Sequence, residues 1–164
     1  MMDLKQYDLK KLLLTAMKSE VESKDLYLEL SKKTENGLLQ DKLRFLADEE
    51  EKHRIFIEDI YRNHFPESKI EMPDKSPVPM PNVQFKDDTP LSKIMRQAMQ
   101  AEQAASDFYK SLAERFEDES KIHNTLMYFA DMEIGHLKLI EMEKNTMERY
   151  EEDEVYWPMI HVGP

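Results

Sequence analysis

The chain has 164 residues, and charged residues make up 35% of it, with a formal net charge of -11. That length suits one domain with a substantial core. The negative charge argues against nucleic acid and anionic membrane surfaces as partners. Because the sequence contains no cysteine, it cannot form disulfides, iron–sulfur clusters, thiolate zinc sites or thiol nucleophiles.

The N-terminal residues and the longest apolar runs bear on targeting and on membrane insertion. Residues 1–14 carry scattered charges and lack the apolar centre of a signal peptide. No apolar run approaches the roughly 20 residues that a membrane-spanning helix needs. We therefore expect a soluble, intracellular protein with no membrane partner.

Apolar residues spaced three and four apart predict four helices, at about 8–34, 38–64, 91–116 and 120–149. Asn36-Gly37 interrupts the pattern between the first two. Residues 66–90 contain six of the eight prolines and cannot be helical. The fold class expected is all-α, with a four-helix bundle in residues 1–150 and a separate tail at 151–164.

The proline-rich segment 66–90 decides how the helices connect. Fully extended, it could reach on the order of 80 Å at about 3.3 Å per residue. A helix of the predicted length measures only about 40 Å. The segment can therefore cross the length of the bundle and start the third helix at the far end. The alternative is a linker between two hairpins that swap between subunits.

The two halves of the chain repeat each other. Four residues of the first helix recur 82 positions later in the third: Glu20, Asp25, Tyr27 and Leu30 match Glu102, Asp107, Tyr109 and Leu112. A set from the second helix recurs 83 positions later in the fourth: Ala47, Asp48, Glu50 and His53 match Ala130, Asp131, Glu133 and His136. One helix hairpin is thus used twice.

Six polar residues interrupt the apolar stripes of these helices. They are Glu20, Glu50, His53, Glu102, Glu133 and His136. The paired glutamates are equidistant from their turns, so antiparallel helices place them at one height in mid-bundle. Each His follows its Glu by one turn and can bind the same ion. Two divalent cations would balance the four carboxylates, which otherwise repel each other in a dry core.

A single Glu-x-x-His in a chain this rich in Glu would be a surface coincidence. Two copies at matching heights, each paired with a Glu on the core stripe about 30 residues upstream, instead predict a two-metal site.

These six residues carry a family resemblance. Over residues 8–149 the chain resembles the ferritin-like di-iron carboxylate proteins, specifically the rubrerythrin branch, which take one Glu from each of two helices and Glu-x-x-His from the other two. The resemblance implies a ferritin-like bundle, a di-iron centre, a cytoplasmic location and chemistry with peroxide or dioxygen. The chain departs from rubrerythrins proper at Ala105, where they carry an extra Glu, and in lacking the cysteines of a rubredoxin-like domain.

The function expected is a non-haem di-iron oxidoreductase that reacts with hydrogen peroxide or dioxygen. Its cofactor would be two iron ions, although manganese or zinc could occupy the same ligands. Electrons would come from a separate donor protein such as a rubredoxin, and a homodimer is expected. One alternative is an iron-binding ferroxidase for storage or detoxification. Another is a structural helical dimer with a vestigial ligand set.

Several nearby residues have open roles. Tyr27 and Tyr109 could hydrogen-bond ligand carboxylates or be ordinary core aromatics. The repeated aspartates are expected at the surface or beside the histidines: Asp25, Asp48, Asp107 and Asp131. Gly135 could allow close helix packing or leave room for a substrate, and close packing is the interpretation we favour. The apolar tail, 155–162, should pack on the bundle or on a neighbouring subunit.

Overall fold

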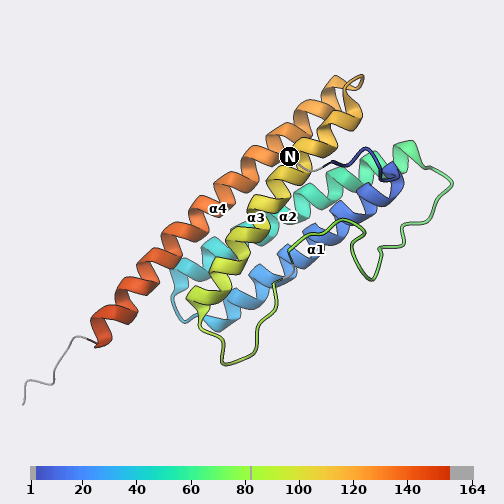
Figure 1. Ribbon diagram of the computed structural model, residues 1–164. Helices are drawn as coiled ribbons and strands as arrows, with labels where there is room; N and C mark the ends of the chain where they lie inside the picture. Colours follow the sequence, from blue (N-terminus) through green and yellow to red (C-terminus); the bar gives the residue numbers. More distant parts are fainter. Residues whose placement is uncertain (1–2, 82, 156–164) are drawn as a thin grey trace, which may run out of the picture.

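The computed structural model describes residues 3–81 and 83–155, and long helices account for most of them (Figure 1). The helices are α1 (Leu9–Lys33), α2 (Gly37–His64), α3 (Leu91–Ala113) and α4 (Ser120–Val155), and a short 3-10 helix, η1 (Glu114–Phe116), follows α3. No strand occurs in these described ranges. The predicted all-α bundle is confirmed.

Side-chain caps explain where the first two helices begin. The Asp8 carboxylate accepts a hydrogen bond from the Lys11 backbone N–H at 3.1 Å, at the start of α1. The Asn36 side chain does the same for Leu39 at 3.1 Å, at the start of α2. Each cap satisfies one backbone donor that the first helical turn leaves unpaired.

Two helix ends differ from the prediction. The third helix ends at Ala113 because its last turn tightens into η1. The fourth continues to Val155 instead of stopping near 149, so the acidic residues 151–154 are helical rather than part of a tail. Residues 156–164 lie outside the described residues, and the packing of the tail stays a prediction.

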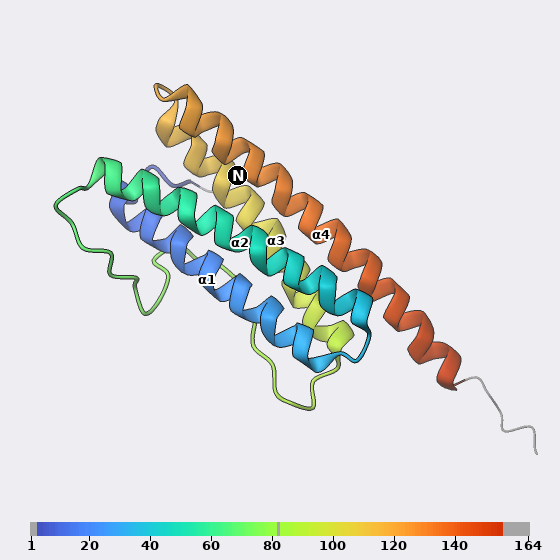
Figure 2. The ribbon, with the colours of Figure 1, turned by 180° about the vertical axis from the view of Figure 1, so that it is seen from behind.

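The helices form two antiparallel hairpins that pack face to face. Packing is closest within each hairpin, between α1 and α2 and between α3 and α4. The hairpins meet through α1 against α3 and α2 against α4. Figure 2 shows the four helices from behind, with α4 extending past the others. At 36 residues α4 measures about 54 Å, whereas the 25 residues of α1 measure about 38 Å.

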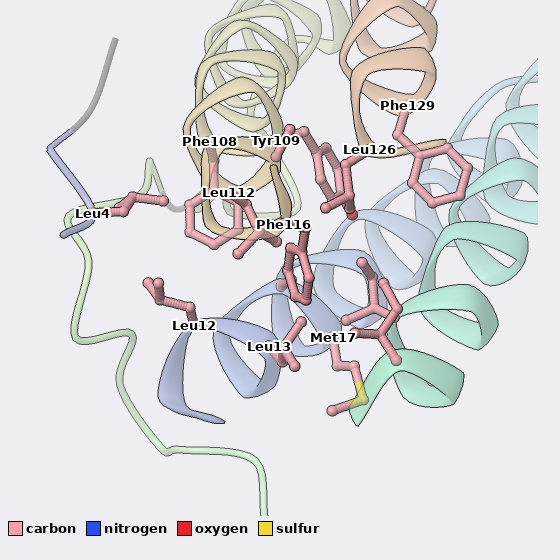
Figure 3. Packing of buried hydrophobic residues seen from close by; sticks show 14 of the residues in the cluster. Leu4, Leu12, Leu13, Met17, Phe108, Tyr109, Leu112, Phe116, Leu126 and Phe129 are labelled. Atoms are coloured by element: carbon pink, nitrogen blue, oxygen red, sulfur yellow. The ribbon is translucent and has the colours of Figure 1, made fainter. Parts of the chain in front are cut away.

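The apolar core is divided into two clusters along the bundle. One joins the start of α1 to the ends of α2 and α3 and the start of α4, and includes Leu13, Ile60, Leu112 and Leu126 (Figure 3). The other lies toward the opposite end and includes Leu30, Leu43, Met95 and Ile140. On every helix, the residues between the two clusters include those predicted to bind metal.

The crossover lies along α1 of the same chain (Figure 1). Near the start of α1, the Lys10 ammonium donates to the Ser68 hydroxyl at 3.0 Å. At its end, Lys33 pairs with Asp87 at 3.5 Å. Val78 is buried between these points and anchors the segment to the core. In this chain the segment therefore runs along its own bundle from one end of α1 to the other.

No helix in the described part of the chain is long and apolar enough to cross a membrane.

Gly135 does not serve close packing, so that interpretation was wrong. It is exposed, and a Cβ built on it would meet nothing within 4 Å. The glycine only adds backbone freedom to the unfolded chain, which the helix must restrict on folding.

We therefore expect Gly135→Ala to raise the free energy of unfolding by about 0.5–1 kcal/mol, measured by chemical denaturation. Gly37→Ala is the control, because Gly37 also meets nothing within 4 Å but opens the first turn of α2, where the gain should be smaller. Destabilisation by Gly135→Ala would mean that another molecule packs against this side of α4.

Candidate metal centre

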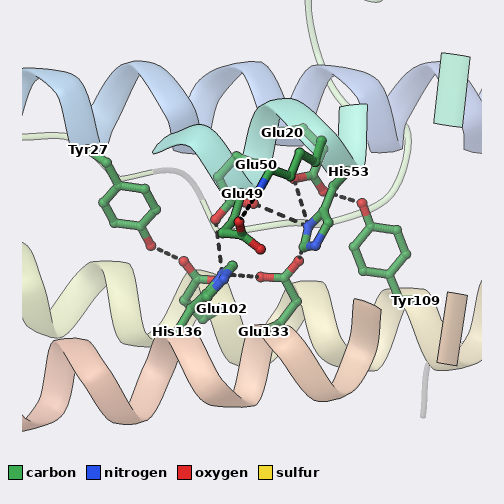
Figure 4. A network of polar contacts seen from close by, with 10 residues as sticks. Glu20, Tyr27, Glu49, Glu50, His53, Glu102, Tyr109, Glu133 and His136 are labelled. Carbon is green, nitrogen blue, oxygen red and sulfur yellow. Dashed lines mark hydrogen bonds and ion pairs between the residues drawn. The ribbon is translucent and has the colours of Figure 1, made fainter. Parts of the chain in front are cut away.

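The structure brings the six predicted residues together midway along the bundle (Figure 4). Glu20 comes from α1, Glu50 and His53 from α2, Glu102 from α3, and Glu133 and His136 from α4. All six are at most 5% exposed. Since Glu is almost never fully buried without a partner, this arrangement requires compensation.

The cluster divides into two overlapping groups, each able to hold one ion. The first consists of Glu20, Glu50, His53 and Glu133. The second consists of Glu50, Glu102, Glu133 and His136. Within each group the candidate ligand atoms lie within 4.8 Å of one another. Glu50 and Glu133 belong to both groups, so these two carboxylates are positioned to bridge a pair of ions.

Both imidazoles turn Nδ1 toward the carboxylates. His53 Nδ1 lies 2.9 Å from Glu133 Oε1 and 3.5 Å from Glu50 Oε2. His136 Nδ1 lies 3.1 Å from Glu133 Oε2 and 3.2 Å from Glu50 Oε1. The rings are nearly parallel, with centroids 5.9 Å apart. Each histidine therefore offers the same nitrogen to its own group.

Several buried atoms of the cluster have no hydrogen-bond partner among the described residues. They are Glu50 Oε1, Glu133 Oε1 and both ring nitrogens of His53. His53 Nδ1 and Glu133 Oε1 are close, but they are not aligned as a hydrogen bond. Unpaired buried polar atoms are costly, and cations held by the two groups would satisfy three of the four: Glu50 Oε1, Glu133 Oε1 and His53 Nδ1. Carboxylate oxygen and imidazole nitrogen also suit iron, manganese and zinc, so the residues fit a metal.

Burial and crowding shift the pKa values of the site. Burial, and then the charges of Glu50 and Glu133 respectively, raise the pKa of Glu20 and of Glu102 well above the usual range. Burial alone would lower the pKa of His53, but its contacts with Glu133, Glu20 and Glu50 outweigh burial and raise it to about 12.

The pKa of His136 follows the same balance. Burial disfavours its charged form, yet Glu133 and Glu50 raise its pKa to about 9. The metal-free site therefore holds protons near neutral pH, and metal binding must displace them.

Tyr27 and Tyr109 contact the cluster from opposite ends (Figure 4). The Tyr27 hydroxyl donates to Glu102, and the Tyr109 hydroxyl donates to Glu20. Each tyrosine therefore orients a carboxylate that belongs to the other hairpin. Burial, together with the nearby charge of Glu20, raises the pKa of Tyr109 well above its usual value, so its hydroxyl keeps its proton. Of the two roles left open by the sequence, the contact with ligand carboxylates is the correct one.

Phe129 is a neighbour that the sequence did not single out. Its ring lies 4.1 Å from that of His53, centroid to centroid, and contacts Tyr109 and Phe56 at their edges. The available signal was its register, since it precedes Glu133 by one helical turn on the same stripe. This aromatic packing limits the movement of the His53 ring.

The four repeated aspartates lie away from the cluster, and so do two histidines that are not in the predicted ligand set. Asp25, Asp48 and Asp131 are exposed and Asp107 is half-buried. His64 contacts Glu119 and the Ile60 carbonyl, and His123 contacts the Ala113 carbonyl. Among the described residues, neither four-residue group includes a side chain at position 105.

Replacing either tyrosine with phenylalanine should weaken metal binding, because a ligand carboxylate loses the donor that orients it. We expect Tyr27→Phe or Tyr109→Phe to lower the affinity for one ion by about 10–100-fold. Anaerobic titration with Co²⁺ measures this. Tyr61→Phe is the control, since that buried hydroxyl donates to the Lys69 carbonyl outside the site. Unchanged affinity in both site variants would contradict the assigned role.

Comparisons with known proteins agree with this geometry. The rubrerythrin family model matches residues 11–152. A solved structure of a hypothetical protein from Pyrococcus furiosus superposes with a TM-score of 0.76 at 28% identity, covering 90% of this chain and 94% of that one. No curated protein matches. With most of its length matched by the family model and its four helices arranged around a buried carboxylate cluster, the chain belongs to the rubrerythrin family.

Proposed function

We propose that the protein is a non-haem di-iron oxidoreductase of rubrerythrin type, which reduces hydrogen peroxide or dioxygen. One observation carries the proposal. Two buried ligand groups share Glu50 and Glu133, so the same two carboxylates can hold a pair of metal ions side by side. Family membership makes iron the metal to test first.

Each residue has a distinct part in this proposal. Glu50 and Glu133 belong to both ligand groups and would hold both ions, while Glu20 with His53 and Glu102 with His136 would complete the two sites. Reduction of hydrogen peroxide to two water molecules consumes two protons and two electrons, and two ferrous ions held by these residues would supply the electrons. The Tyr27 and Tyr109 hydroxyls hold the terminal carboxylates in place.

The surrounding core keeps bulk water away from the site. Phe129 covers His53, and the two apolar clusters close the bundle on either side along its axis. A water-excluded site strengthens the attraction between the carboxylates and divalent cations. With four carboxylates and two neutral imidazoles, two divalent ions leave no net charge in the core.

We propose that a separate donor protein returns electrons after each cycle, since the 164 residues contain no cysteine for an iron–sulfur relay. A rubredoxin is the donor to test. The homodimer and the cytoplasmic location also remain predictions.

The first test is stoichiometric. Anaerobic titration should show about two ferrous ions per chain, because the six ligands form two equivalent groups. Glu50→Ala and Glu133→Ala should each reduce binding at both sites. The matched controls are Asp48→Ala and Asp131→Ala, which remove exposed carboxylates from the same two helices. Full occupancy in a Glu50/Glu133 double variant would refute the ligand assignment.

The second test concerns turnover. The ferrous-loaded protein should gain near-ultraviolet absorption when one equivalent of hydrogen peroxide is added. Repeated cycles should require an added donor such as reduced rubredoxin. Oxidation without donor-dependent cycling would favour iron storage or detoxification. A protein that binds iron but responds to neither peroxide nor dioxygen would rule out the oxidoreductase.

A further inference from the structure

The crossover covers the groove between α1 and α3 at the height of the metal centre. Met80 from the crossover, Ser19 and Glu20 from α1, and Ala105 from α3 line one crevice there. Glu20 is a member of the first ligand group. The crevice therefore joins the crossover directly to a candidate metal ligand.

A larger hollow lies outside this crevice. It has a volume of about 300 Å³ and is lined by α1 and by the crossover, including the exposed residues Asp74, Lys75 and Pro79. Thr15, Ser19 and Met80 line both spaces. The crevice itself is too narrow to hold a water molecule. Hollow and crevice thus form one path toward Glu20 that is closed at its inner part.

Short side chains and one flexible methionine line the inner part, together with the rings of Phe108 and Tyr109. Ala16, Ser19 and Ala105 carry short side chains there. Met80 is half-buried, and its unbranched side chain has three rotatable bonds, so it can move without a change in the backbone. The buried Val78 nearby anchors the segment that carries it.

Thr15 gives the path a polar contact. It is 2% exposed, and its hydroxyl oxygen has no hydrogen-bond partner among the described residues. Leaving a buried hydroxyl unpaired is costly, so a small molecule with O–H groups would be stabilised as it passes. The unpaired Thr15 hydroxyl is therefore a second observation, independent of the shape of the crevice, that favours a polar ligand here.

The charges around the hollow favour the entry of a neutral molecule. Lys18 and Lys75 face the space together with Glu22 and Asp74, and Lys18 pairs with Glu22 at 2.7 Å. The two signs balance, so the hollow does not concentrate cations as an acidic funnel would. A neutral, hydrogen-bonding molecule suits this lining better than a ferrous ion.

We propose that hydrogen peroxide reaches the metal centre through this path. The Met80 side chain blocks the crevice until it changes rotamer, and the Thr15 hydroxyl forms a hydrogen bond with the peroxide as it passes. The inference rests on the proposed function, because it assigns an entry route to that same site. Met80 and Thr15 are specificity-determining residues and do not touch the reacting atoms.

The first test compares rates at full metal loading. Stopped-flow mixing of the ferrous protein with peroxide should be faster in Met80→Ala by on the order of tenfold, equivalent to a barrier lowered by about 1.4 kcal/mol. Ala105→Leu should slow the reaction by filling the crevice. Met72→Ala is the matched control, since Met72 is an exposed methionine of the same crossover. Equal rates in all four proteins, each with two ions bound, would overturn the proposal.

Thr15→Val tests the hydrogen bond between Thr15 and peroxide, because valine lacks the hydroxyl but has nearly the same side-chain shape as threonine. Oxidation by peroxide should slow several-fold, while binding of nitric oxide, which needs no hydrogen bond, should keep its rate. If peroxide oxidation and nitric oxide binding slowed equally, the substitution would have disturbed the packing in general, and the role assigned to the Thr15 hydroxyl would be refuted.

A readout without metal separates this inference from the proposed function. Crystals of metal-free Met80→Ala pressurised with xenon should bind a xenon atom beside Ala105, because an apolar space of sufficient size accepts xenon. Metal-free wild-type crystals should not. Xenon binding in a protein whose iron-loaded form reacts with neither peroxide nor dioxygen would preserve the path and reject the oxidoreductase. The reverse pattern, peroxide reactivity with no xenon and no effect of Met80→Ala, would reject the path alone.

Discussion

The structure depends on how four carboxylates can be buried in one apolar bundle. Isolated charges in such a core are strongly unfavourable, and like charges side by side add to the cost. In the metal-free chain, protons retained by Glu20, Glu102 and the two imidazoles offset part of this cost. Divalent cations would offset it more fully, and any ligand that binds only the folded chain also stabilises it. The site is therefore a centre of stability as well as of proposed chemistry.

Neither hairpin can complete this site alone. Each candidate ion group takes ligands from both hairpins, and each tyrosine donates across the gap between them. Direct helix packing is tighter within a hairpin than between hairpins. The polar centre therefore links the two halves, alongside the two apolar clusters that join all four helices. A duplicated hairpin thus forms one unit, and the duplication places two similar candidate metal positions in it.

The crossover contributes more than a connection. It covers one side of the bundle at the height of Glu20, and it is tied to both ends of α1 by Lys10 and Lys33. Access to a buried centre must then depend on which side chains the crossover presents. Met80 lies at that point, which gives a segment outside the helices control over what reaches the site.

The sequence alone determined the four helices, the repeat and the six clustered residues, because helical periodicity and turn positions are local and fix which side chains share a face and a height. It could not decide the role of Tyr27 or Tyr109, because a core aromatic and a carboxylate donor have the same register. Nor could it decide the surroundings of Gly135 or the place of Met80. Those depend on distances between segments far apart in the chain, and only tertiary packing sets such distances.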